Sequence, residues 1–326
     1  MAVYTEVTDE EVAAFVADYA IGAVVACKGI AEGVENSNFL LATDRGTFIL
    51  TLYERRVRPE DLPFFLGLME HLAAAGVPCP VPVRAQDGTA LRMLAGRPAA
   101  IVTFLRGLWP KRPTPHHCSG VGEALAALHL AGLDFPCGRS NDLSVQGWRA
   151  LLEACVSHGD RFAADLADDL AEELTAELAA LETAWPQQLP AGIIHADLFP
   201  DNVFFERDRL SGVIDFYFAC RDFLAYDLAI CLNAWCFEPD GSFNITKARR
   251  LLTAYHARRP LTASELAALP LLARGAAMRF LLTRLYDWLN TPRNALVSPK
   301  NPAEYLQKLR FHRRIRGPEG YGLGRP

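Results

Sequence analysis

The residues best suited to chemistry form one short pattern in the second half of this 326-residue chain. Residues 194–202 read Ile-His-Ala-Asp-Leu-Phe-Pro-Asp-Asn, and an Ile-Asp-Phe run follows at 214–216. Phosphoryl transfer needs a carboxylate that accepts a proton from the attacking hydroxyl, and oxygen ligands that hold Mg²⁺ on the phosphates. Asp197 fits the first role, and Asn202 and Asp215 fit the second. The pattern therefore predicts a phosphotransfer site.

An alternative is that these side chains are ordinary turn and capping residues, because Asp, Asn and Pro all favour turns. That interpretation accounts for each residue singly but not for their common spacing. The local pattern also suits a site. Strands are expected at 202–206 and 210–215, and a hairpin there would bring Asn202 and Asp215 together.

The 194–202 segment resembles the catalytic loop of the aminoglycoside-phosphotransferase and choline-kinase branch of the protein-kinase-like superfamily, which has the form H-x-D-x-x-x-x-N. The resemblance implies that Asp197 and His195 are catalytic and that Asn202 and Asp215 bind metal.

Residues 222–229, Asp-Phe-Leu-Ala-Tyr-Asp-Leu-Ala, resemble a helix start that follows the catalytic loop in this branch. The resemblance implies that Asp227 provides structural support for the loop. The local alternatives are Asp222 as a helix N-cap and Asp227 as a partner of the helix dipole.

Further stretches narrow the resemblance to the bacterial homoserine kinases that use this fold. They lie at 122–131, 141–144, 279–292 and 305–312. The resemblance implies ATP and Mg²⁺ as cofactors and transfer of phosphate to the side-chain hydroxyl of L-homoserine, giving O-phosphohomoserine for threonine biosynthesis. Another acceptor (an amino sugar, choline or a methylthio-sugar) is the first alternative, and a non-catalytic pseudokinase scaffold is the second.

The expected elements suit an α+β fold with two lobes, as the resemblance implies. A small antiparallel-sheet lobe, 1–105, would cover the nucleotide phosphates, and a mostly helical lobe, 106–326, would carry the catalytic and metal loops. In the first lobe, strands are expected at 23–31, 37–43, 46–53, 81–84, 90–94 and 99–104, and helices at about 8–19 and 61–75. In the second lobe, helices are expected near 116–131, 144–157, 160–184, 223–236, 246–258, 263–289 and 302–313. Thr8 with Glu11, and Thr262 with Glu265, have the spacing of capping boxes.

Nucleotide contacts are expected from a polar loop and from a hinge. The loop lies between the first two strands, where the family's phosphate-covering loop should be, and its candidates are Lys28, Gly33, Asn36, Ser37 and Asn38. An ordinary polar hairpin turn is the alternative. The candidate hinge that follows the sheet contributes Phe104 and Leu105.

One position departs from the family pattern. The family usually has Lys or Arg on the third strand, paired with a helix Glu, but Thr51 stands at that position and residues 64–67 contain no acid. The joint absence is physically consistent, because either charge alone and buried would be costly. Lys28, Arg55 or Arg56 would then supply the cation, or Mg²⁺ alone would suffice.

The acceptor site is expected on the helix that ends near residue 290. Arg279, Thr283, Tyr286 and Asn290 form one polar stripe at helical spacing, and Arg279 can bind a carboxylate through two parallel bonds. Arg279 and Tyr286 are therefore the candidates for substrate binding. A solvent-facing stripe is the alternative, and Arg284, which Asp287 could pair, is the second choice for the carboxylate.

The composition excludes several classes of protein. The net charge of −5 argues against a general nucleic-acid binder, and 51% hydrophobic residues can form a large core. We expect no membrane-spanning run, no cleavable signal and no obligatory protein partner, only ATP and a small amino-acid substrate. The eight cysteines include no C-x-x-C pair, which favours reduced thiols in the cytoplasm.

Overall fold

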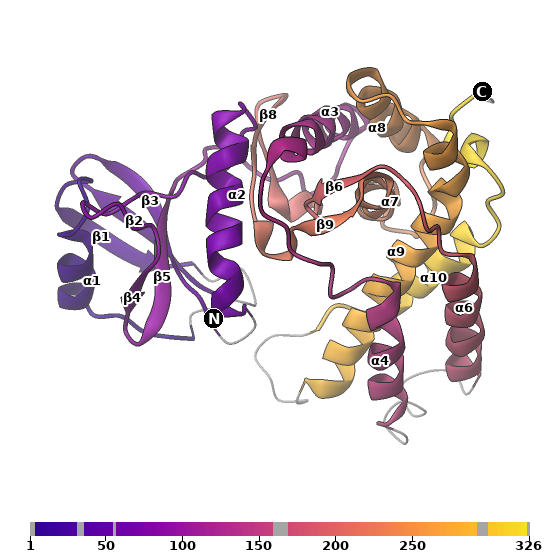
Figure 1. The fold of residues 1–326 in the computed structure, drawn as a ribbon, viewed down its shortest axis with the longest axis horizontal. Coiled ribbons are helices and arrows are strands. Elements are labelled where there is room, and N and C mark those ends of the chain that lie inside the picture. Colours follow the sequence, from indigo (N-terminus) through magenta and orange to yellow (C-terminus); the bar gives the residue numbers. More distant parts are fainter. Residues whose placement is uncertain (1–3, 31–35, 55–56, 159–168, 292–298, 325–326) are drawn as a thin grey trace. The chain divides into compact units, whose positions relative to one another are not determined.

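The computed structural model describes residues 4–30, 36–54, 57–158, 169–291 and 299–324. The chain forms two compact units, which Figure 1 shows as ribbons. The first unit contains residues 1–108, 134–139 and 203–218, and the second contains 109–133, 140–202 and 219–326.

The first unit is built on a five-stranded antiparallel sheet with the order β1-β2-β3-β5-β4. Its strands are β1 (Val24–Gly29), β2 (Ser37–Thr43), β3 (Gly46–Leu52), β4 (Arg92–Leu94) and β5 (Arg97–Thr103). Helix α1 (Asp9–Val16) packs its buried side on one face, where Phe15 joins Leu41 and Leu50 in a core cluster. The strand period of two therefore sends Asn38 and Thr51 to the opposite face.

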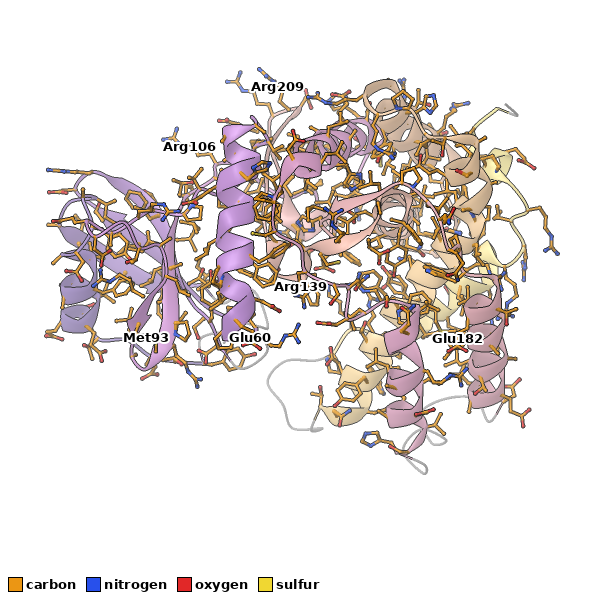
Figure 2. All side chains as sticks on the ribbon, viewed as in Figure 1. Glu60, Met93, Arg106, Arg139, Glu182 and Arg209 are labelled. Atoms are coloured by element: carbon orange, nitrogen blue, oxygen red, sulfur yellow. The ribbon has the colours of Figure 1, made fainter. Side chains whose placement is uncertain are left out.

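Helix α2 (Leu62–Ala74) and segment 134–139 complete the sheet unit (Figure 2). The ring of Phe135 lies 5.6 Å from that of Phe64. Arg139 donates to Asp61 at 2.8 Å and stacks over Phe65 at 5.6 Å. The hairpin predicted after the 194–202 segment is also part of this unit, as β7 (Val203–Glu206) and β8 (Arg209–Val213).

Two expectations for the first unit need correction. The predicted strand at 81–84 is wrong, because only an isolated bridge joins Pro82 to Val102. The prolines at 80 and 82 have no N–H groups to donate to a strand ladder, so the pairing cannot extend. The first helix ends at Val16, short of residue 19, although its predicted Thr8–Glu11 capping box is present.

The second unit is mostly helical, with α7 (Leu224–Trp235) buried along most of its length. The other helices are α3 (Pro115–Ala131), α4 (Val145–Val156), α6 (Leu170–Ala184), α8 (Ile245–Arg258), α9 (Ala263–Asn290) and α10 (Ala303–His312). The sequence did not predict the two-stranded sheet here, in which β6 (Ala191–Ile194) pairs with β9 (Cys220–Phe223). The predicted capping box of Thr262 and Glu265 begins α9.

Helix α9 also corrects the expectation about membranes. Among the described residues it is the one helix long and apolar enough to span a bilayer, by length and composition. However, 67% of that apolar window is buried inside the protein, as in the core helix of a globular unit. All eight cysteines lie in the described part of the chain, and all are free thiols.

Candidate active site

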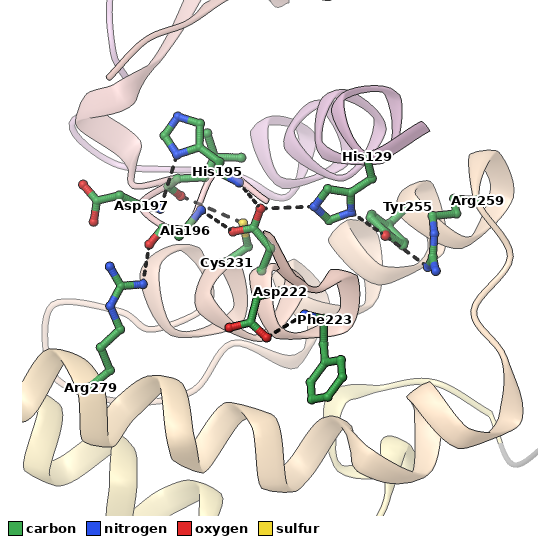
Figure 3. Close-up of polar contacts among 12 residues, drawn as sticks. His129, His195, Ala196, Asp197, Asp222, Phe223, Cys231, Tyr255, Arg259 and Arg279 are labelled. Carbon is green, nitrogen blue, oxygen red and sulfur yellow. Dashed lines mark hydrogen bonds and ion pairs between the residues drawn. The ribbon is translucent and has the colours of Figure 1, made fainter. Parts of the chain in front are cut away.

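One buried carboxylate, that of Asp227, holds the start of the 195–202 loop, whose residues His195, Ala196 and Asp197 are labelled in Figure 3. Asp227, on α7, is 0% exposed and accepts hydrogen bonds from the backbone N–H groups of His195, at 2.7 Å, and Ala196, at 3.0 Å. Burial alone would raise the pKa of Asp227, but hydrogen bonds from His129 and the loop outweigh it and hold the pKa below its usual value. The carboxylate is therefore ionised where it meets the loop.

Ala196 is held on its other side by an arginine. The carbonyl oxygen of Ala196 accepts a hydrogen bond from Arg279 Nη1 at 2.6 Å, and Arg279 is only 2% exposed. Ala196 has φ of +63°, a left-handed conformation that costs a non-glycine residue on the order of 1–3 kcal/mol. Asp227 and Arg279, which form a clamp on this residue, stabilise the conformation that directly precedes Asp197 (Figure 3).

Asn202 completes the loop and is oriented by it. Its side-chain nitrogen donates to the backbone oxygen of Asp197 at 2.9 Å and to the Asp197 carboxylate at 3.3 Å. The nitrogen of the amide therefore faces Asp197, and the side-chain oxygen of Asn202 points away from it. An oxygen presented in this way suits a hard cation such as Mg²⁺. His195, which is fully buried, accepts a hydrogen bond from the Asp197 N–H through Nδ1 at 3.3 Å.

A buried polar relay runs from Asp227 to the start of α9. His129 contacts Asp227 through Nε2 at 3.1 Å and Tyr255 through Nδ1 at 2.7 Å. Arg259 donates to the Tyr255 oxygen at 3.2 Å and pairs with Glu265 at 2.8 Å. These four residues, His129, Tyr255, Arg259 and Glu265, are called the relay below.

The protonation states give the relay one direction. Burial lowers the pKa of His129, so its imidazole is neutral and carries one N–H. That proton lies on Nε2, because the ionised Asp227 can only accept. Nδ1 of His129 must then accept from the Tyr255 hydroxyl, whose oxygen accepts from Arg259. The hydrogen bonds from Arg259 through Tyr255 and His129 are therefore all directed toward Asp227 and the loop.

The sequence did not identify the relay or the clamp. His129 lies in a stretch that carried a resemblance only, and Tyr255 lies in a helix assigned by periodicity. The two partners of His129 lie 98 and 126 residues away in the chain, and helical spacing contains no information about such contacts. The resemblance supplied the one available signal, through Asp227.

In the first unit, the predicted metal ligand Asp215 lies just beyond the end of β8. Asp215 has φ of +65° and intermediate exposure. Tyr217, two residues later, has its hydroxyl 3.1 Å from that of Tyr53. Asp215 belongs to the first unit and Asn202 to the second.

The predicted phosphate loop divides between the two faces of the sheet. Lys28 is exposed and pairs across the sheet with Leu40, which places it on the face that carries Asn38. Ser37 is 0% exposed on the other face, where its hydroxyl donates to Glu54 at 2.7 Å and accepts from the Tyr4 N–H at 2.8 Å.

Three of the four remaining nucleotide-binding candidates, Asn36, Phe104 and Leu105, lie in the described part of the first unit. Asn36 is 5% exposed, and its side-chain oxygen accepts from a backbone N–H at 3.3 Å. Phe104 is 42% exposed, and Leu105 packs so closely on Gly212 that an added Cβ there would lie 2.6 Å from Leu105. Gly33, Arg55 and Arg56 lie outside the described residues.

The polar stripe of α9 spans two environments. Arg279 is buried against the 195–202 loop, whereas Tyr286 is 40% exposed, so the structure does not bring these two candidates together. Arg284 pairs with Glu304 on α10 at 2.6 Å, and its guanidinium lies 4.4 Å above the Tyr305 ring.

The chain resembles known proteins over most of its length. The family model described as "Phosphotransferase enzyme family" matches residues 26–261. The homoserine kinase of Rhodospirillum rubrum is 65% identical over 325 residues and covers 100% of both chains. The homoserine kinase of Paramagnetospirillum magneticum is 63% identical, with 99% of this chain and 100% of that protein covered. The homoserine kinase of Xanthobacter autotrophicus is 62% identical, with 99% of each covered.

Solved structures share the fold at much lower identity. An amicoumacin kinase in complex with AMP-PNP and Ca²⁺ has a TM-score of 0.67 at 14% identity and covers 95% of this chain and 93% of its own. A microcompartment-associated aminopropanol kinase has a TM-score of 0.65 at 17% identity and covers 95% and 97%. These similarities confirm the predicted α+β fold of the kinase type.

Proposed function

The chain belongs to the phosphotransferase enzyme family, and from this premise we propose that it transfers a phosphoryl group from ATP to the side-chain hydroxyl of L-homoserine. The product would be O-phosphohomoserine, an intermediate of threonine biosynthesis. The observation that carries the proposal is the identity of 61–65% to curated homoserine kinases, which extends over essentially the full length of the chain. We further propose that the enzyme works in the cytoplasm and needs only its two small-molecule substrates.

The 195–202 loop supports the proposed roles of the catalytic residues. Asp197 would accept the proton of the attacking homoserine hydroxyl. His195 would position Asp197 by accepting a hydrogen bond from the Asp197 backbone N–H. Asn202, with its side-chain oxygen turned away from Asp197, and Asp215 would hold Mg²⁺. The bound metal would neutralise charge on the transferring phosphate. Asp227 would keep the loop in register.

The nucleotide would contact the sheet unit. We propose residues 1–105 as the lobe that covers the phosphates and 106–326 as the lobe that binds the acceptor. The phosphate contacts would come from Lys28, Gly33, Asn36, Ser37 and Asn38, and the base contacts from Phe104 and Leu105. The exposure of Lys28 and of Phe104 supports their part in this proposal.

The acceptor would be bound near the end of α9. Arg279 is the proposed partner of the homoserine carboxylate, with Tyr286 farther along the helix. The bond from Arg279 to the Ala196 oxygen gives Arg279 a second role in shaping the loop. Kinetics of Arg279→Leu would separate the roles: loss of carboxylate binding raises the KM for homoserine, whereas loss of the clamp lowers kcat at unchanged KM.

The test is a coupled assay of ADP release, with Mg²⁺-ATP and a panel of acceptors. The panel contains L-homoserine, L-threonine, choline, an aminoglycoside and a methylthio-sugar. We expect turnover with homoserine, and phosphate on its side-chain oxygen by mass spectrometry. A higher kcat/KM for another acceptor would replace homoserine as the substrate. Absence of turnover with every acceptor, in protein that binds ATP, would favour a scaffold.

A further inference from the structure

The sheet face that lacks the expected cation carries a set of hydroxyl groups. Thr51, at the position in question, is 3% exposed and donates from its hydroxyl to the side-chain oxygen of Asn38 at 2.8 Å. Tyr217 is hydrogen-bonded to the Thr51 hydroxyl, and its own hydroxyl lies 3.1 Å from that of Tyr53. Tyr53, Tyr217 and Thr51 are called the hydroxyl chain below. All three, and Asn38, belong to the first unit.

The Thr51 hydroxyl has one consistent direction. An amide oxygen can only accept, so the hydrogen of Thr51 is committed to Asn38. The Tyr217 and Tyr53 hydroxyls, 3.1 Å apart, share a hydrogen bond in which either can donate.

Aromatic packing holds the chain in place. The Tyr217 ring meets the Tyr53 ring edge-on at 5.4 Å and the Phe65 ring edge-on at 5.6 Å. Phe65 lies on the turn of α2 where the family usually places the acidic partner of the strand cation. An alcohol, Thr51, and an apolar ring, Phe65, therefore occupy the two positions of the missing ion pair, and burying them incurs no desolvation of charge.

The bond from Thr51 determines the orientation of the Asn38 side-chain amide. Because the side-chain oxygen of Asn38 faces Thr51, its NH₂ group is the end turned away from the hydroxyl chain. Asn38 has intermediate exposure and lies on the same sheet face as Lys28. Phosphate oxygens are acceptors, so they need a donor at this position, and a flipped amide would present an oxygen to them instead.

We propose that the hydroxyl chain replaces the strand cation by fixing the Asn38 amide with its N–H groups toward the phosphates of the nucleotide. The ligand is the polyphosphate of ATP, held here by a neutral donor beside the Lys28 ammonium group. This assignment rests on the proposed function for the identity of the nucleotide, but it does not depend on the acceptor.

The experiment measures affinity for ATP and for adenosine by calorimetry. Thr51→Val removes the hydroxyl from Thr51 and keeps its shape. It should weaken ATP binding about tenfold and leave adenosine binding unchanged, because adenosine has no phosphates. Thr51→Ser should recover most of the ATP affinity. Thr47→Val is the matched control on the same strand, since Thr47 is exposed and is not part of the hydroxyl chain.

Two further variants test the other members of the hydroxyl chain. Tyr217→Phe should weaken ATP binding less than Thr51→Val does, and Tyr53→Phe should have the smallest effect. Equal losses of ATP and adenosine affinity in Thr51→Val, or a Thr51→Ser protein as weak as Thr51→Val, would overturn the proposal. Because the measured quantity is nucleotide affinity, the result applies equally if homoserine proves not to be the acceptor.

Discussion

The 195–202 loop and the face of β3 are organised by opposite chemistry. The loop is held by buried charges, with Asp227 accepting two backbone N–H groups and Arg279 donating to the carbonyl that follows them. The β3 face is held by neutral hydroxyls that end on an amide.

The difference reflects what each region has to hold. A strained backbone segment with several N–H groups needs an acceptor that can take all of them, and an ionised carboxylate can accept at about four positions. A single amide needs only one bond to select its orientation. A buried charge would be more costly there, because it would require an equally buried partner. In these two regions, charge orders backbone in the 195–202 loop, whereas a neutral hydroxyl orients the Asn38 amide beside β3.

The largest expected effect comes from substitution of Asp197, the proposed proton acceptor in the 195–202 loop. Asp197→Asn keeps the shape of the side chain but removes the proton acceptor, so kcat should fall by roughly 10²–10⁴, the usual contribution of a positioned general base. The affinity for ATP should change little. Turnover by purified Asp197→Asn protein at the parent rate would show that Asp197 has a different role.

Acid should destabilise the protein through its buried neutral histidines. Burial lowers the pKa of His129, and burial with the nearby Lys308 lowers that of His312 to about 3. A histidine with a lowered folded pKa stabilises the protein above its unfolded pKa of about 6.5, and that stability is lost as pH falls toward the folded pKa. His312 alone should cost roughly 3 kcal/mol between pH 7 and pH 4. Urea unfolding across this range measures it.

His312→Gln should make the free energy of unfolding less dependent on pH. Comparing this variant with the parent protein separates the contribution of His312 from that of the carboxylates. Tyr217, with its pKa of about 12, does not titrate in the same range, so acid leaves the hydroxyl chain protonated. A stability profile that stays level from pH 7 to pH 4 in the parent protein would contradict the buried neutral histidines.

Substitution of the proposed metal ligands should weaken ATP affinity in the presence of Mg²⁺ by about tenfold or more. Asp215→Ala removes a carboxylate from the proposed Mg²⁺ site, so both the Mg²⁺ requirement and ATP affinity should weaken. Asn202→Ala should show a milder form, because an amide oxygen carries no charge. ATP titrations with and without Mg²⁺ measure both. Unaltered metal dependence in Asp215→Ala would exclude it as a ligand.

The smallest effect should come from the far end of the relay. Tyr255→Phe leaves the buried Nδ1 of His129 without its donor and should cost about 1–3 kcal/mol of unfolding free energy. It should also lower kcat several-fold at unchanged KM, because His129 positions Asp227.

A second buried histidine–tyrosine pair provides the control for Tyr255→Phe. Tyr321 contacts His312 Nδ1 at 2.8 Å, and the hydrogen bonds of this pair do not lead to the 195–202 loop. Tyr321→Phe should lose similar stability and keep kcat. If both variants lost kcat equally, the relay would have only a general structural role.

The sequence predicted the features that depend on local spacing. The Thr8–Glu11 and Thr262–Glu265 capping boxes are present because each is complete within four residues. The hairpin of β7 and β8 was found for the same reason. Strand β9 was missed because Cys-Arg-Asp-Phe has no alternation, and its pairing with β6 is a long-range contact.

The environment of a residue was harder to predict than its position. Periodicity placed Arg279 and Tyr286 on one stripe, but it could not show that the first is 2% and the second 40% exposed. The absence of a charge at Thr51 was visible, yet its replacement depends on Tyr217, far away in the chain. Distant partners of this kind are determined by the packed fold and leave no pattern in a short window.

Thr51 also has a consequence for chemical labelling. A reagent that acylates an amine beside the ATP phosphates would react with a lysine on the third strand if one were there. Here that position is an alcohol engaged with Asn38, and an alcohol is a weak nucleophile at neutral pH. Lys28, on β1, is the only lysine in the sequence of the first unit. A survey based on such reagents would overlook this enzyme or record it through an acyl group on Lys28, which peptide mass spectrometry would reveal.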